Sequence, residues 1–257
     1  MSEITAVTFD LWQTLLLDNP ERGRIRSQAR LEGARNTLAR VGQQFTIEDI
    51  EEAYRAGVRR CQEIREGHRD VTFLQQVQIF VNHISPRLVE QIPTQTFHEI
   101  AQSYSDSFFE HPPGPHPEGV RVLQNVQDMG LRMGMISNTG MTPGVSFRRF
   151  LEEHGMLGFF DVLTFSDEVG YSKPSCEIFN LTLSELGSTP DQAVHVGDHF
   201  MNDVVAARGC GLKAIWIDSF SEMPDPVDPD SEPDVRVSSL GEVPDAIKRI
   251  IDDSRAN

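Results

Sequence analysis

The chain has 257 residues, of which 39% are hydrophobic and 24% are charged, so it can bury a globular core and is not expected to be disordered. Its formal net charge of −16 at pH 7 repels nucleic acid phosphates and anionic lipids, which excludes nucleic acid and membrane surfaces as expected partners. No apolar run reaches the roughly 18 residues of a membrane-spanning helix, and no basic, apolar leader opens the chain. We therefore expect a soluble, cytoplasmic protein.

The three cysteines, Cys61, Cys176 and Cys210, are odd in number, widely separated and without a CxxC pair. This pattern argues against a disulfide framework and against a zinc site, and it fits a reducing compartment. We therefore expect neither a disulfide framework nor a zinc site.

The first predicted element is a short buried strand over residues 5–9, which ends at Asp10. From about residue 21 to residue 107 the pattern changes to long helical periodicities with little strand signal. The helices predicted there are 25–41, 47–65, 74–84 and 96–109. A proline- and glycine-rich segment, 111–119, then breaks the pattern and would carry the chain back to the core.

After this break, predicted helices and strands alternate along the chain. The helices are 120–129, 146–154, 176–186, 203–208 and 243–251, and the strands are 132–136, 161–165, 193–196, 214–217 and 234–237, with an exposed loop at 224–233. This alternation predicts βαβ units and a parallel sheet. We predict an α/β fold with a doubly wound, Rossmann-like sheet, in which residues 1–17 and 113–257 form the core and residues 18–112 form a helical cap.

Polar side chains follow four of the predicted core strands. They are Asp10 after the first, Ser137 and Asn138 after the second, Lys173 after the third, and Asp198 with Asp203 after the fourth. Ligands of open α/β sheets bind beyond the carboxyl ends of the strands, so these side chains are expected to meet. Singly, each has an ordinary explanation as a helix cap, a turn residue or a solvated charge, but their order along the chain favours one site.

These residue types suit phosphoryl transfer. A carboxylate can act as a nucleophile and form a covalent intermediate, and Mg²⁺ held by carboxylates can neutralise the charge of an anionic phosphoryl group. Asp10, Asp198 and Asp203 would supply such carboxylates. Lys173 would add a positive charge, and Ser137 would add a hydrogen-bond donor to the phosphoryl oxygens.

The four sites, in this order, resemble the sequence motifs of the haloacid dehalogenase-like hydrolases, a superfamily whose helical cap is often inserted after the first strand. The resemblance implies Asp10 as the nucleophile and Ser137, Asn138 and Lys173 as phosphoryl-binding residues. It also implies Mg²⁺ bound by Asp10, Asp198 and the backbone carbonyl of Trp12, with Asp203 as a further ligand or as a partner of a ligand. The expected substrate is a small phosphorylated molecule.

The sequence departs from the phosphatases of that family at one position. They carry a second aspartate two residues after the nucleophile, which protonates the leaving group and then activates water; here that residue is Trp12, and Gln13 replaces the usual glycine. An indole cannot exchange a proton near neutral pH, and loss of a general acid–base costs about 10²- to 10⁴-fold in rate. His199, Asp18 and Glu21 are candidate substitutes, although His199 could equally cap the loop beside Asp198.

Two branches of the family also lack the second aspartate. Haloacid dehalogenases carry a tyrosine there and work without Mg²⁺, but their fourth motif differs from Gly197-Asp198. Phosphonoacetaldehyde hydrolases use a cap lysine, and residues 18–112 contain no lysine. Three functions therefore stay open: a Mg²⁺-dependent phosphatase, which we favour, a hydrolytic haloacid dehalogenase, and a catalytically weakened protein that binds a phosphorylated ligand or a partner.

Other charged residues have simpler readings. The predicted cap carries Arg59, Arg60, Arg65 and Arg69, which could recruit an anionic substrate. Because they alternate with glutamates, a solvated helix face is the favoured interpretation. His195 lies within a predicted buried strand and is expected to be a hydrogen-bonded core histidine. The oligomeric state is not legible from the sequence.

Overall fold

The computed structural model describes residues 3–220, 223 and 228–256. Its core is a six-stranded parallel sheet in the order β5-β4-β1-β6-β7-β8. The strands are β1 (Ala6–Phe9), β4 (Arg132–Ser137), β5 (Val162–Phe165), β6 (Ala193–Gly197), β7 (Lys213–Ile217) and β8 (Val235–Val237). The predicted α/β fold is therefore confirmed.

Helices cover both faces of the sheet. One face packs against α6 (Gly119–Gln127), α7 (Gly144–Glu153) and α11 (Val243–Ala256), and the other against α9 (Cys176–Leu186) and α10 (Ala206–Gly209). Successive β1 residues alternate between the two cores, with Val7 and Phe9 in the first and Ala6 in the second. Such two-sided burial explains why each strand is a nearly continuous apolar run.

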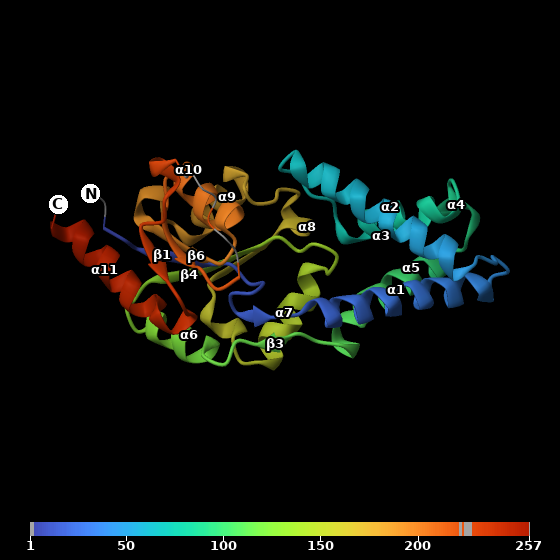
Figure 1. The fold of residues 1–257 in the computed structure, drawn as a ribbon, viewed down its shortest axis with the longest axis horizontal. Coiled ribbons are helices and arrows are strands. Elements are labelled where there is room, and N and C mark those ends of the chain that lie inside the picture. Colours follow the sequence, from blue (N-terminus) through green and yellow to red (C-terminus); the bar gives the residue numbers. More distant parts are fainter. Residues whose placement is uncertain (1–2, 221–222, 224–227, 257) are drawn as a thin grey trace.

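Five helices between residues 20 and 110 pack on one another beside the sheet, at the end of the molecule opposite α11 (Figure 1). They are α1 (Pro20–Arg40), α2 (Ile47–Glu66), α3 (Phe73–Ile84), α4 (Leu88–Gln91) and α5 (Thr94–Glu110). Their shared apolar core contains Leu38, Phe80 and Tyr104. We call these helices the cap; their status as a separate domain stays a prediction.

Two crossing segments connect the cap to the core. The chain leaves through β2 (Leu16–Leu17) and returns through β3 (Gly114–Pro115), and these short strands pair antiparallel. The sequence analysis did not predict these strands, because two-residue segments carry no periodicity. It also missed α4 and α8 (Ser166–Val169), which span four residues each.

The cysteine prediction was wrong in one respect, because one pair of cysteines is bonded. Cys176 and Cys210 form a disulfide, with Cα atoms 5.4 Å apart, and Cys61 is a buried free thiol. Cys176 begins α9 and Cys210 follows α10, and these helices pack on the same face of the sheet. A spacing of 34 residues does not reveal this proximity, so the cysteine pattern no longer supports a reducing compartment.

Two further expectations concern membranes and one loop. Across the described ranges, no helix combines the length and apolar character needed to cross a lipid bilayer. The loop predicted at 224–233 falls partly outside the described residues, at 224–227.

Candidate active site

Asp10 follows the last residue of β1, near the middle of the sheet. The chain passes from β1 to β4 on one side and later returns to β6 on the other, so strand order reverses around β1. That reversal opens a crevice at the carboxyl ends of the strands. The Asp10 backbone N–H donates to the carbonyl of Val196 at 2.8 Å, which fixes the residue beside β6, and Asp10 is 6% exposed.

Lys173 holds two of the predicted carboxylates together. Its Nζ lies 2.6 Å from Asp10 Oδ1 and 2.6 Å from Asp203 Oδ1, and all three side chains are buried. Asn138 fixes the lysine backbone from both sides, because its Nδ2 donates to the Lys173 carbonyl at 2.9 Å and its Oδ1 accepts from the Lys173 N–H at 2.8 Å. Residues 35 positions apart thus form one unit.

The segment after β6 brings Asp198 and Asp203 to the same place. A Cβ on Gly197 would lie 2.3 Å from Asp203 Cγ, so only glycine fits where the chain turns. The Trp216 indole N–H donates to the Asp198 carbonyl at 2.9 Å, which anchors this turn to β7. Residues Phe200–Val205 then form a π-helical turn, a form that is often found at functional sites.

Asp203 has a partner on each carboxylate oxygen. Oδ2 accepts the backbone N–H of His199 at 2.9 Å, and Oδ1 contacts Lys173 and, at 3.2 Å, His195 Nε2. The other nitrogen of His195 lies 2.8 Å from Thr8 Oγ1. The buried core histidine expected from the sequence thus also orients Asp203, a role that its position in a strand does not reveal.

The cluster is electrostatically unbalanced. Burial raises the pKa of Asp10 to about 6 against the opposing effect of Lys173, and burial together with Asp10 and Asp203 raises that of Asp198 to about 8. Burial by itself would raise the pKa of the Asp203 carboxyl group, but Lys173 and His195 outweigh it and hold that pKa well below its usual value. Three carboxylates thus face one ammonium group, and an added cation would stabilise their ionised forms.

The donor set fits Mg²⁺. Oxygen atoms of Asp10, Asp198 and Asp203 lie within 4.8 Å of one another, and carboxylate oxygens are the ligands that this ion prefers. The raised carboxyl pKa values indicate the same need for positive charge. The Trp12 carbonyl as a further ligand stays a prediction.

A cavity of about 240 Å³ opens beside the cluster. Its lining residues are Asp10, Trp12, Gln13, Asn138, Lys173, Asp198, His199, Asn202 and Asp203. Ser137 does not line it: the residue is fully buried at the end of β4, and within the described residues its Oγ has no hydrogen-bond partner. The phosphoryl-binding role of Ser137 stays a prediction.

Trp12 and Gln13 form one wall of this cavity. The Trp12 ring packs edge-on against Phe147, with centroids 5.7 Å apart. Gln13 adopts φ +60°, the left-handed region that favours glycine. Its side chain offsets that strain through two hydrogen bonds with the Asp18 backbone, at 3.1 and 3.2 Å, which explains how glutamine replaces the glycine.

The three candidate substitutes for the acid–base aspartate lie in different places. His199 lines the cavity, but its Nδ1 also accepts the Asn202 N–H at 3.3 Å as a helix cap. Asp18 forms a buried ion pair with Arg26, and Glu21 is exposed at the start of α1. Of the three, His199 alone lines the cavity around Asp10.

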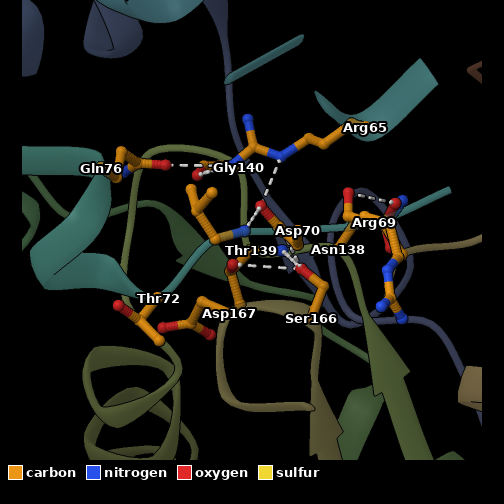
Figure 2. A network of polar contacts seen from close by, with 12 residues as sticks. Arg65, Arg69, Asp70, Thr72, Gln76, Asn138, Thr139, Gly140, Ser166 and Asp167 are labelled. Carbon is orange, nitrogen blue, oxygen red and sulfur yellow. Dashed lines mark hydrogen bonds and ion pairs between the residues drawn. The ribbon is translucent and has the colours of Figure 1, made fainter. Parts of the chain in front are cut away.

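A buried polar network joins the cap to the core near this site (Figure 2). Asp70, in the loop after α2, accepts the Ser166 hydroxyl at 2.6 Å and Arg65 Nε at 3.0 Å. Arg65 also donates to the Gly140 carbonyl at 2.7 Å, and the Asp70 N–H donates to the Gly170 carbonyl at 3.0 Å. The cap therefore contacts the loops that carry Asn138 and Lys173.

One cap arginine departs from the solvated helix face expected for the group. Arg59, Arg60 and Arg69 are exposed, and the Arg69 guanidinium also stacks on Tyr171, 4.4 Å from the ring centroid. Arg65 instead has a side chain only 13% exposed and pairs with a fully buried carboxylate. The loop at residues 67–72 turns the end of α2 toward the core, which helical periodicity does not predict.

Comparison with known proteins agrees with this geometry. The family model for haloacid dehalogenase-like hydrolases matches residues 4–211. The chain belongs to this family. The chain is therefore a hydrolase of this family.

Relatives and solved structures place the chain among related enzymes. It is 33% identical over 147 residues to a phosphoserine phosphatase of Thermus thermophilus, a match over 56% of this chain and 57% of that protein, and so little more than half of either. It is 26% identical over 253 residues to a ribulose-1,5-bisphosphate 5-phosphatase of Halopiger xanaduensis, covering 95% of this chain and 99% of that protein. A 2-haloacid dehalogenase structure from Pseudomonas syringae matches with a TM-score of 0.69 and 20% identity, over 96% of this chain and 99% of that one, which shows a shared fold.

Proposed function

We propose that this hydrolase is a Mg²⁺-dependent phosphatase that acts on a small phosphate monoester through a phosphoaspartate on Asp10. The observation that carries the proposal is the contact of one ammonium group with two carboxylates, Lys173 with Asp10 and Asp203, beside the third carboxylate of Asp198. The relatives named phosphoserine phosphatase and ribulose-1,5-bisphosphate 5-phosphatase support a phosphate-ester substrate.

In the proposed reaction, Asp10 would attack phosphorus. Its carboxylate oxygen would bond to phosphorus as the bond from phosphorus to the leaving oxygen breaks, and that oxygen leaves with the electron pair. Water would then attack phosphorus, release inorganic phosphate and restore the Asp10 carboxylate. Lys173 Nζ lies 2.6 Å from Asp10 Oδ1 and would offset the negative charge of the carboxylate and the phosphoryl group in both steps.

The acidic cluster would supply the metal site. Asp10, Asp198, Asp203 and the Trp12 carbonyl are the groups that would hold Mg²⁺. When bound, the ion would supply positive charge that lowers the repulsion between the Asp10 carboxylate and the phosphoryl oxygens.

Trp12 decides which step is slow. Its indole acts neither as an acid nor as a base near neutral pH, so an alkoxide leaving group would have to take its proton from elsewhere, and water would have to attack without a base at this position. His199, which lines the cavity, is our candidate for both tasks. We expect good leaving groups to react readily and hydrolysis of the phosphoaspartate to limit turnover.

Hydrolytic dehalogenation is a second candidate, favoured by Trp12, because a halide leaves without a proton. Asp10 would attack the carbon that bears the halogen and form an ester, which water would then cleave. The clustering of Asp198 with Asp10 favours the phosphatase, since dehalogenation needs no metal and so gives no reason for a second carboxylate there.

A third candidate is a protein weakened by Trp12 that binds a phosphorylated ligand without turnover.

One assay separates these functions. p-Nitrophenyl phosphate is incubated with the protein with and without Mg²⁺, beside Asp10→Asn and, as a matched control, Asp252→Asn on the exposed side of α11. The phosphatase predicts Mg²⁺-dependent release that Asp10→Asn abolishes and Asp252→Asn retains. Release equal to the Asp10→Asn background would contradict it, and chloride release from 2-chloropropionate without Mg²⁺ would establish the dehalogenase.

A further inference from the structure

A second cavity, of about 430 Å³, adjoins the first on the side of the cap. Trp12 and Asn138 line both cavities. The other walls come from α1, from α2 through Tyr54, and from the loop that follows β4. A molecule held at Asp10 could therefore extend past Trp12 into this space.

Two arginines of α1, Arg26 and Arg30, line the second cavity, and they differ in their partners. Arg26 forms a buried ion pair with Asp18 and donates to the His111 carbonyl at 2.9 Å. Its guanidinium also lies 5.8 Å from the Trp12 ring centroid. The charge of Arg26 is thus compensated within the protein.

The charge of Arg30 is not compensated in this way. Arg30 is 5% exposed, yet across residues 3–220, 223 and 228–256 no carboxylate lies within ion-pair distance of it. Its hydrogen bonds go to neutral groups: the Tyr104 carbonyl, Ser107 Oγ, Tyr54 Oη and Thr142 Oγ1, at 3.0–3.3 Å. Buried charges are almost always paired, because desolvation otherwise destabilises them.

Arg30 also acts on Tyr54, its neighbour in the cavity wall. Burial by itself would raise the pKa of the Tyr54 hydroxyl, but Arg30 and a hydrogen bond with Ser27 bring it below its ordinary value. Two guanidinium groups face one carboxylate along these walls, in a protein whose formal net charge is −16. The cavity is a local exception to the acidic surface, placed beside the nucleophile.

We propose that Arg30 binds a second anionic group of the substrate, a carboxylate or a phosphate, and so selects phosphate monoesters that carry another negative charge. The guanidinium fork matches either oxyanion, and the anion would provide the counter-charge that Arg30 lacks. This inference rests on the proposed phosphatase function for its meaning, but its geometry can be tested without turnover.

The test measures binding. A series of ω-phosphonocarboxylates of increasing chain length is titrated calorimetrically in the presence of Mg²⁺, each against the alkylphosphonate of equal length, which lacks the carboxylate. We expect at least one phosphonocarboxylate to bind the wild-type protein about 10- to 100-fold more tightly than its match, since hydrogen bonds to charged groups contribute that much. The chain length of the best ligand would measure the span from Asp10 to Arg30.

Variants assign the effect to the residue. Arg30→Gln is expected to remove most of that preference, Arg30→Lys to keep part of it, and Arg59→Gln, an exposed cap arginine with the same change in charge, to keep all of it. A purely structural role for Arg30 would leave the preference unchanged in Arg30→Gln. Thermal unfolding of each variant checks folding, and a partial loss of the preference in Arg30→Lys, which keeps the charge, decides the question if Arg30→Gln does not fold.

The outcomes separate this inference from the proposed function. Equal affinity for every matched pair in the wild-type protein would overturn the anion site even if p-nitrophenyl phosphate is hydrolysed. A preference that depends on Arg30 would support the site even if no phosphate ester is turned over. For active protein, the ratio of kcat/KM for 3-phosphoglycerate to that for glycerol 3-phosphate is expected to fall in Arg30→Gln.

Discussion

Two neighbouring cavities meet at Trp12 and Asn138, and their linings carry opposite charge. In the core cavity, three carboxylates face Lys173. In the cavity beside the cap, two guanidiniums face Asp18. A bound cation would stabilise the excess carboxylates of the core cavity, and a bound anion would stabilise the excess guanidinium charge of the cavity beside the cap.

The two cavities are expected to have different roles. The core cluster is assembled from strand ends that belong to one sheet, and its residue types suit a reaction at phosphorus. The second cavity depends on how the cap sits on the core, because Arg30 comes from α1 and Thr142 from the loop after β4. Changes in the core should therefore alter chemistry, and changes at the cap should alter which substrates react.

The largest effect is expected when the core cluster loses its cation. Lys173→Met would remove the ammonium group that contacts the buried carboxylates of Asp10 and Asp203, which should lower the free energy of unfolding by about 3–5 kcal/mol and abolish hydrolysis of p-nitrophenyl phosphate. Urea unfolding at pH 7 measures the first effect. Lys248→Met removes an exposed ion pair with Asp245 and should change stability by less than about 1 kcal/mol; equal values for the two variants would contradict the account of the cluster.

Trp12 marks the boundary between the cavities. Trp12→Asp should restore a proton donor and raise kcat for an alkyl phosphate by up to about 10²-fold. Trp12→Phe is the control, because it keeps an aromatic ring beside Phe147. If the aspartate variant is no faster than the phenylalanine variant, the missing acid–base group does not limit turnover.

The polar network of Figure 2 should determine how firmly the cap is held on the core. Asp70→Asn removes the charge that pairs with Arg65 and weakens the acceptor of the Ser166 hydroxyl, which should cost about 2–3 kcal/mol in unfolding free energy. Glu63→Gln, which breaks an exposed pair with Arg60, should cost less than about 1 kcal/mol. Indistinguishable unfolding curves for these two variants would show that the network does not hold the cap.

The smallest effect concerns Asp167, beside the network. Burial raises its pKa to about 6 from 3.8, so its ionisation destabilises the fold as pH rises through that window, and the loss persists above it. Asp167→Asn should therefore raise the free energy of unfolding by about 1–2 kcal/mol at pH 8, and the gain should vanish below about pH 4. Denaturation from pH 3.5 to 8 measures this difference, and a difference that does not vary with pH would contradict the assignment.

The sequence was more informative for the core than for the cap, for a physical reason. Asp10, Lys173, Asp198 and Asp203 each follow a strand, and parallel strands end at the same edge of a sheet, so their meeting was predictable. The position of Ser137 outside the cavity lining was not predictable. The pattern of apolar and polar residues along the sequence does not show toward which side a single side chain at a strand end points.

The arginines of α1 were missed because charged residues on a helix are usually solvated. Arg26 and Arg30 lie four residues apart, on the face that also carries the buried residues Ala34 and Leu38. That shared face was the available signal. The Cys176–Cys210 disulfide left no comparable signal, since it depends on the packing of α9 beside α10.

The most direct test of the central claim is to trap the intermediate. The protein is mixed with p-nitrophenyl phosphate and Mg²⁺, quenched in acid within the first turnover, and digested for peptide mass analysis. Because Trp12 cannot activate water, we predict a burst of p-nitrophenol equal to the enzyme concentration and the mass of one phosphoryl group on the peptide that contains Asp10. Steady release with no burst and no modified peptide, from protein that hydrolyses the ester, would contradict a phosphoaspartate on Asp10.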